Sequence, residues 1–216
     1  MTALYLLADP TRDPDWKQDA SALLDYVRTS FGRGPFAGAW AIDEQRAPGR
    51  PGCCSPVGLG STTSRWAAAN ALLAARTGDG EAHELAFRSL NYATYFAAGN
   101  GLVSCCGKRS YNTYWFSDGY ADYLRSFNWA MAALPELAPK RQNHLLGSSS
   151  VVQAVSYGRR RVAYRTFDRS STEVLRLNFR PARAVGATGW DVQPLTGGDY
   201  AIRVRHDDSR RIQVEG

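Results

Sequence analysis

"KRQNHLLGSSS", residues 140–150, marks the point at which the hydrophobic pattern of this 216-residue chain changes. Before it, apolar residues recur roughly every three to four positions, as on the buried face of a helix; after it, they alternate with polar residues, as on a half-buried strand. Helices that all precede the strands are typical of an α+β protein. The pattern therefore predicts a helical domain at residues 1–146 and a β-domain at residues 147–216.

Four segments of the N-terminal part have helical spacing. In the first of them Trp16, Ala20, Leu24 and Val27 fall on one stripe. The segments begin at capping residues or end at glycine or proline, and the short turn "TGDG" predicts antiparallel helical hairpins. The segments are residues 13–31, 61–78, 79–101 and 117–137. Long loops are expected at residues 32–59 and 99–114, and loops of this length are often functional.

Four segments of the C-terminal part alternate between apolar and polar residues. The segments are residues 150–158, 160–168, 173–181 and 200–206. The turn signals "YGRR", "DRSST" and "TGGD" lie between them. Strands of this kind pair antiparallel, with one face packed and the other in water. We expect a small antiparallel β-sandwich.

The formal charge of +6 comes almost entirely from arginine residues that are spread through the chain. Two local runs, Arg159 to Arg161 and Arg205 to Arg211, fall in the expected strand region. A nucleic-acid-binding protein usually gathers its basic residues on one face or in one tail. The sequence therefore predicts solvated strand edges and no nucleic-acid partner.

No apolar run approaches the roughly 20 residues that a membrane-spanning helix requires. The N-terminus "MTALYLLADPTRD" lacks the basic region of a signal peptide. We expect a cytoplasmic protein without membrane association, unless this chain begins inside a longer one.

The four cysteines form two adjacent pairs, Cys53-Cys54 and Cys105-Cys106. Zinc ligands are normally two to four residues apart, so that both thiolates can turn toward one metal. We expect free thiols, with one or two disulfides or a metal site as the alternatives. The three histidines also lack metal-ligand spacing, and no cofactor or metal is expected.

Three stretches carry a family resemblance: "GLGSTTSRWAAANALLAARTGD", "TYWFSDGYADYLRSFNWAMAALPELAP" and "YRTFDRSSTEVLRLNFRP". They resemble the C-terminal portion of proteins of the six-hairpin glycosidase group, whose fold is an α/α toroid. The resemblance implies a partial toroid followed by a β-sandwich, and a carbohydrate ligand. Because an incomplete ring leaves an apolar edge exposed, it also implies self-association or a partner chain at that edge.

Glycoside hydrolysis needs two carboxyl groups that flank the scissile bond. Asp118 lies at the start of an expected helix behind two aromatic residues, whereas Asp43 and Glu44 follow Trp40 in "AWAIDEQ". These three acids are the candidate catalytic residues. A helix-capping role is the alternative for Asp118, because a carboxylate there accepts backbone N–H groups.

Aromatic rings can stack on sugar faces, and polar side chains can bind sugar hydroxyls. The candidate substrate-binding residues are Trp115, Tyr114, Tyr111, Arg65, Trp66 and Trp40. For Arg65 and Trp66 the alternative is helix surface and core. The sequence thus predicts a carbohydrate-active protein, hydrolase-like if it is an enzyme. A non-catalytic carbohydrate-binding or interaction remnant is the alternative.

Overall fold

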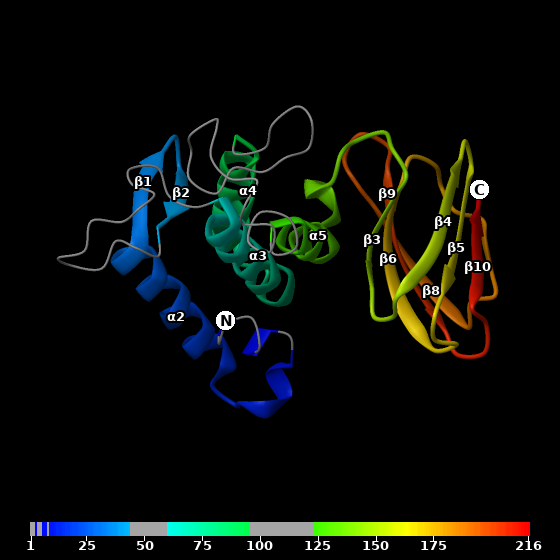
Figure 1. Ribbon diagram of the computed structural model, residues 1–216, viewed down its shortest axis with the longest axis horizontal. Coiled ribbons are helices and arrows are strands. Elements are labelled where there is room, and N and C mark those ends of the chain that lie inside the picture. The colour runs from blue at the N-terminus through cyan, green and yellow to red at the C-terminus, as the bar shows by residue number, and fades with distance from the viewer. Residues whose placement is uncertain (1–2, 4–5, 8, 44–59, 96–122) are drawn as a thin grey trace, which may run out of the picture. The chain divides into compact units, whose positions relative to one another are not determined.

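The computed structural model describes residues 3, 6–7, 9–43, 60–95 and 123–216. The chain divides into two compact units, Met1–Ala133 and Leu134–Gly216. Helices dominate the first unit and antiparallel strands the second (Figure 1). The predicted α+β class is therefore confirmed.

Unit 1 contains helices at each of the four predicted segments. They are α2 (Trp16–Phe31), α3 (Gly60–Thr77), α4 (Gly80–Thr94) and α5 (Tyr123–Ala133), preceded by the short η1 (Pro10–Arg12). Gly78 ends α3 at a positive φ of 72°, where a Cβ atom would be strained. Asp79 then caps α4, since its side chain accepts from the N–H groups of Glu81 (2.9 Å) and Ala82 (3.1 Å).

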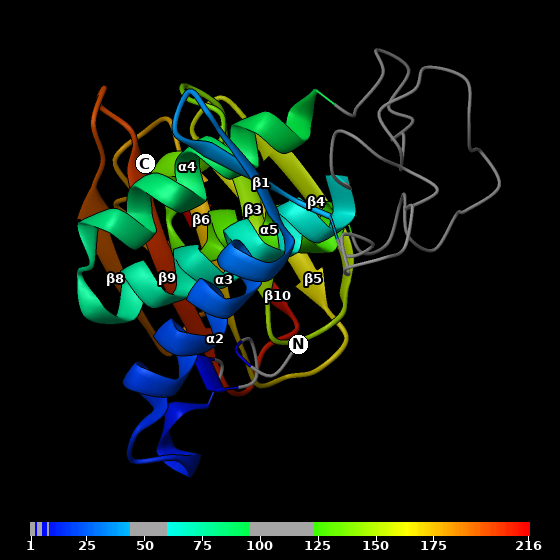
Figure 2. The same cartoon turned by 90° about the vertical axis from the view of Figure 1, so that its left-hand side faces the viewer.

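Small side chains let α3 and α4 pack closely as a hairpin (Figures 1 and 2). Both helices bury mainly alanine. The buried alanines are Ala67, Ala68, Ala69, Ala71 and Ala74 of α3, and Ala82, Ala86 and Ala93 of α4. An alanine keeps the helical backbone rigid at no cost in side-chain entropy. Because α3 also packs against α5, its alanines bury more than one face of this helix.

A two-stranded hairpin, β1 (Gly32–Phe36) and β2 (Ala39–Ile42), occupies the start of the segment predicted as a loop. Figure 2 shows it beside α3 and α4. The amide of Ile42 donates to Thr63 of α3, and that of Trp40 donates to Ser89 of α4. The prediction of an irregular loop at these residues was wrong. The glycine and proline residues of this short hairpin interrupt the alternation of apolar and polar residues that indicates a strand.

Unit 2 contains one short helix and eight strands within two four-stranded antiparallel sheets. One sheet has the order β4-β5-β10-β7 and the other β3-β6-β9-β8. The elements are η3 (Pro135–Leu137), β3 (His144–Ser148), β4 (Val152–Gly158), β5 (Arg161–Thr166), β6 (Ser171–Leu177), β7 (Arg183–Val185), β8 (Gly189–Pro194), β9 (Tyr200–His206) and β10 (Arg211–Glu215). The expected boundary between residues 146 and 147 falls within β3.

Both sheets contribute to one hydrophobic cluster, in which alternate residues of the central strands are buried. Its members are Val162, Tyr164, Leu175, Leu177, Phe179, Ile202, Val204, Ile212 and Val214. Burying a side chain of this size contributes about 1.5–3 kcal/mol relative to exposure. The alternating apolar residues of these strands therefore point into this core, and the residues between them point toward the outer faces of the sheets.

Arg176 lies on the other face of β6 and is nevertheless fully buried. Its guanidinium donates two hydrogen bonds to Asp199, at 3.0 and 2.7 Å. It also donates to backbone carbonyl oxygens of Pro135, Glu136 and Ala138. This one side chain therefore fixes the η3 segment against the sheet.

The resemblance to the six-hairpin glycosidase group was wrong. Within the described residues there are four α-helices, two four-stranded sheets and one two-stranded sheet, and these form no six-hairpin toroid. The motifs that suggested the group are helix starts, alanine stripes and a glycine–aspartate turn. Any antiparallel helical hairpin needs these features, so they do not identify a particular ring of hairpins.

Among the described residues, no helix has both the length and the apolar character that a membrane span needs.

Candidate functional site

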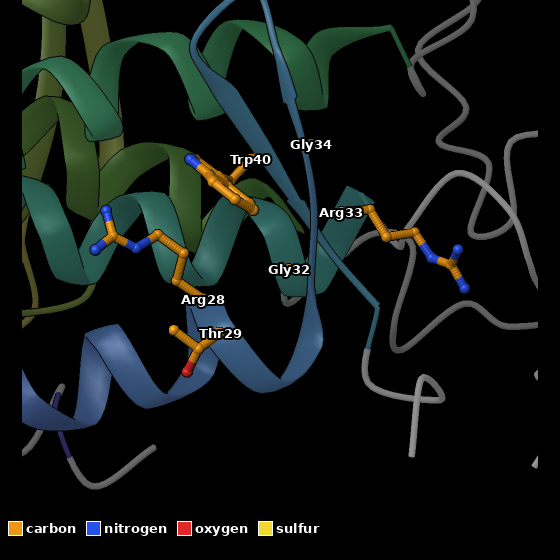
Figure 3. A pocket seen from close by; sticks show the side chains of 6 residues that line it. All are labelled: Arg28, Thr29, Gly32, Arg33, Gly34 and Trp40. Atoms are coloured by element: carbon orange, nitrogen blue, oxygen red, sulfur yellow. The ribbon is translucent and has the colours of Figure 1, made fainter. Parts of the chain in front are cut away.

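A candidate site of unit 1 lies where α2 passes into the β1–β2 hairpin. It is a cavity of about 510 Å³. Its described lining consists of Arg28, Thr29, Gly32, Arg33, Gly34 and Trp40 (Figure 3). Cavities of roughly 300–1,000 Å³ are the usual size for small-molecule sites.

Gly32 brings the walls of this cavity together. The residue is the C-cap of α2, and its N–H donates to the carbonyl oxygen of Arg28. A Cβ atom at position 32 would lie 2.2 Å from that oxygen and 2.9 Å from Cε3 of the Trp40 ring. Only glycine therefore lets the chain leave the helix directly into β1 with the indole ring alongside.

Arg28 is held in place by two carboxylates. Its Nη2 lies 2.7 Å from Asp25 and its Nη1 lies 3.2 Å from Glu81 of α4. A guanidinium has five N–H donors in a rigid fork, so further donors remain for a ligand. The two carboxylates also offset its charge, which suits the cavity to an uncharged polar ligand.

Thr29 and Trp40 supply the other functional groups. The hydroxyl of Thr29 donates to the carbonyl oxygens of Asp25 (2.9 Å) and Tyr26 (3.2 Å), which leaves its oxygen able to accept. The ring of Trp40 is half-buried, and its indole N–H has no hydrogen-bond partner among the described residues. The cavity thus offers one flat apolar face, one donor fork and one acceptor.

Arg33 and Asp43 form an ion pair with each other. Figure 3 shows the Arg33 side chain pointing away from Trp40. Its Nε donates to Asp43 at 2.8 Å, and the side chain of Asp43 is 1% exposed. Asp43, a predicted catalytic acid, is therefore placed in a buried ion pair, and the described residues do not bring a second acid to it.

Arg65 and Trp66, both predicted to bind substrate, line a different cavity of about 290 Å³. Its walls include Leu23, Leu24 and Ile42. Trp66 is 4% exposed, and its indole N–H donates to the carbonyl oxygen of Leu24 at 3.2 Å. The indole N–H of Trp66 thus forms a hydrogen bond that links α3 to α2. Of the predicted site residues that are described, only Trp40 lies in the cavity beside Arg28.

The remaining predicted site residues lie outside the described residues. They are Glu44, Tyr111, Tyr114, Trp115 and Asp118. Their roles stay predictions.

A second polar cluster, in unit 2, surrounds the fully buried Glu173. Its side chain accepts hydrogen bonds from Ser148 (2.9 Å), Ser171 and Tyr164 (3.1 Å). Nε2 of His206 lies 3.1 Å from Glu173, within ion-pair distance, yet at an angle that makes no hydrogen bond.

Serine, glutamate and histidine are also the residue types of a hydrolase site. Here, however, the hydrogen bonds connect them differently. The serines bind the glutamate, whereas a nucleophilic serine must bind the histidine. Glu173 and His206 are both 0% exposed, so no substrate can reach them. The cluster is a structural network within the core.

Over residues 9–43, 60–95 and 123–216, no group of three or more His, Cys, Asp or Glu side chains has a metal-binding arrangement.

The sequence predicted Trp40 but missed Arg28, Thr29 and Gly32. Arg28 and Thr29 occupy the last turn of a polar helix, where such residues usually face water. The missed signal is "FGRGPF", residues 31–36. Its two glycines closely follow the end of a helix, and a tryptophan, Trp40, comes a few residues later. Glycine at such a place often marks a close approach of backbone to a ring or a ligand.

Three comparisons with known proteins were made for the whole chain. No family model, no curated protein and no solved structure matches it.

Proposed function

We propose that this protein binds an oligosaccharide or polysaccharide in the cavity between α2 and the β1–β2 hairpin. The observation that carries the proposal is the position of Trp40. Its ring borders a cavity that also presents the guanidinium of Arg28 and the hydroxyl of Thr29. A flat apolar surface beside a few convergent polar groups is the combination that sugar rings require.

Each group has a counterpart in a sugar. The C–H faces of a pyranose ring can pack on the indole. Sugar hydroxyls can accept from the remaining N–H groups of Arg28 and from the indole N–H, and can donate to Thr29. Because the charge of Arg28 is offset by Asp25 and Glu81, we expect a neutral sugar to bind at least as well as an acidic one.

Binding is supported better than hydrolysis. Hydrolysis needs two carboxyl groups beside the scissile bond. The described lining of the cavity includes no carboxyl group, and Asp43 is engaged by Arg33. A hydrolytic role depends on Glu44 and Asp118, which lie outside the described residues.

We also infer that unit 2 is a small β-sandwich. The support is the single hydrophobic cluster that receives side chains from both four-stranded sheets. Figure 1 draws these two sheets face to face. The partner chain expected at an exposed helical edge stays a prediction.

The test is calorimetric titration of the purified chain with neutral and acidic oligosaccharides, followed by the same titration of Trp40→Ala and Thr29→Val. We expect both variants to bind about tenfold more weakly or worse, because a lost stacking face or hydrogen bond costs on the order of 1–2 kcal/mol. Trp40→Phe keeps a flat ring and should retain part of the affinity.

Thr94→Val is the matched control, because the hydroxyl of Thr94 also donates to a backbone carbonyl oxygen near the end of a helix, that of Asn91. It should bind as the wild type does. The proposal fails if no sugar binds, or if Thr29→Val and Thr94→Val have equal affinities.

A further inference from the structure

The outer face of the β4-β5-β10-β7 sheet gathers arginines that are far apart in the sequence. Val162 and Tyr164 of β5 and Ile212 and Val214 of β10 point into the core, so the residues between them point outward. The outward residues of these two strands are Arg161, Ala163, Arg165, Arg211, Gln213 and Glu215. The strand register arranges them, with their neighbours on β4 and β7, in three cross-strand rows.

The row at one end of the face contains a carboxylate partner for its arginines. Glu215 lies opposite Arg161 on one side and Arg183 on the other. Arg183 forms an ion pair with Glu215. These contacts, with Arg183 as the first cause, lower the pKa of the Glu215 carboxyl group. This row therefore has one carboxylate between its two arginines within the fold.

The row at the other end contains no carboxylate. Arg211 lies directly opposite Arg165, and Ala154 of β4 follows on the far side. Like charges that face each other across a strand pair destabilise the sheet. Among the described residues, neither Arg165 nor Arg211 has a carboxylate partner. The fold thus bears a repulsion that an external anion would remove.

The same face is hollowed. A cavity of about 510 Å³ is lined by residues of all four strands, including Arg161, Arg165 and Arg211. Small residues, Ala154 and Ala163, form its floor together with Ser156. The middle row, Ser156–Ala163–Gln213–Val185, is uncharged and has two polar and two apolar members. It lies about 7 Å from the arginine row, two strand residues away.

We propose that this face binds an acidic polysaccharide, whose carboxylate or sulfate groups bind between Arg165 and Arg211. The guanidinium fork matches the oxygens of such groups and forms charge-assisted hydrogen bonds. The neutral middle row accommodates the adjoining sugar hydroxyls. The site consists of residues of unit 2 and does not depend on the cavity beside Trp40.

A nucleic acid fits this face less well. Proteins that hold single strands supply aromatic rings for the bases, and the outward positions of these four strands have none. A DNA backbone carries a charge at every residue and no free hydroxyl groups within the strand, so it offers nothing to the uncharged middle row and would meet Glu215 beyond it. Each residue of an acidic polysaccharide also carries uncharged hydroxyl groups, which can lie along that part of the face.

The experiment is calorimetric titration of the full chain with polygalacturonate, dextran sulfate, neutral dextran and a short DNA duplex. The variant is Arg165→Gln/Arg211→Gln. The control, Arg203→Gln/Arg205→Gln, removes two exposed arginines from β9 and changes the net charge equally. We expect the variant to bind both acidic polysaccharides at least about tenfold more weakly, since each charge-assisted contact contributes on the order of tenfold in affinity.

The control should keep its affinity within about twofold, and the variant should show a shallower dependence on salt. The melting temperature of the variant should also rise, because the two arginines that repel each other have been removed. Equal losses in variant and control would reduce the binding to general attraction and overturn the proposal. So would DNA binding as tight as polysaccharide binding, no binding of either acidic polysaccharide, or a lower melting temperature in the variant.

Discussion

The hydroxyl group of Tyr164 is buried against Glu173, and this places a titratable group in the middle of a hydrophobic core. Burial first, and then the neighbouring Glu173, raise the pKa of Tyr164 far above that of a free phenol. The folded protein therefore keeps this proton at a pH at which an unfolded tyrosine, with a pKa of about 10, loses it.

This difference gives the free energy of unfolding an alkaline dependence on pH. Above about pH 10 the unfolded state binds fewer protons than the folded state, so stability must fall as the pH rises, by up to about 1.4 kcal/mol per pH unit. Below that pH the contribution of Tyr164 to stability is fully present. We expect Tyr164→Phe to lower stability near neutral pH but to decline less steeply above about pH 10.

Urea unfolding of wild type and variant at a series of alkaline pH values measures both effects. Tyr157→Phe removes a phenol from the same unit without touching Glu173, and serves as the control. If the free energy of unfolding falls equally steeply with pH in wild type and in Tyr164→Phe, the buried phenol is not the cause of the pH dependence.

Individual residues were predictable only where a local signal exists. Trp40 was selected from its neighbours in the sequence, and it borders the cavity. Arg165 and Arg211 were not selected, because only the pairing of β5 with β10 brings them opposite each other. A strand register that depends on distant turns cannot be derived from either residue alone.

The helical elements depend on their ends as much as on their faces. Asp79 accepts two backbone N–H groups at the start of α4, directly after the left-handed Gly78. Helices leave their first N–H groups without internal partners, so a side-chain acceptor at this position stabilises the whole α3–α4 hairpin.

We expect Asp79→Ala to reduce the free energy of unfolding by about 0.5–2 kcal/mol. Asp79→Asn can still accept both N–H groups and should lose less. Far-UV circular dichroism during urea unfolding reports the helical unit directly. Equal stability of the alanine and asparagine variants would rule out capping by this side chain.

The regular elements were the best predicted part of the fold. The helices lie where the apolar stripes indicate, and β4, β5, β6 and β9 lie where residues alternate. The hairpin β1–β2 was missed because its strands contain glycine and proline, which usually interrupt strands. Packing against α3 and α4 overrides that local preference.

At the scale of the whole molecule, the chain has two compact units with separate cores. Units with their own hydrophobic cores can fold independently, and a chain of two such units need not unfold in one step. Stability should therefore be assigned to each unit, not to the chain.

Scanning calorimetry tests this with one substitution in each unit. Arg176→Met removes the cationic partner of Asp199, which then keeps only the backbone N–H of Arg141, and removing one partner of a buried ion pair costs about 3–5 kcal/mol. We expect two transitions, with Arg176→Met lowering the temperature of one and Asp79→Ala that of the other. A single transition that both substitutions shift would show that the units unfold together.

The class of the fold was predictable from the change of hydrophobic period, but the particular architecture was not. A period reports which faces are buried, and many architectures bury the same faces. The order of strands in the two sheets depends on contacts between distant segments, such as the pairing of β7 with β10.

The network around Glu173 also limits how this sequence can change over generations. Ser148, Tyr164 and Ser171 donate to the same carboxyl group, and His206 lies at ion-pair distance from it, so a substitution of one donor leaves the buried Glu173 without one of its partners. Replacing all the partners with apolar residues can be nearly neutral, whereas replacing one is costly. Descendants of this chain should therefore keep these five residues as a set or lose them as a set.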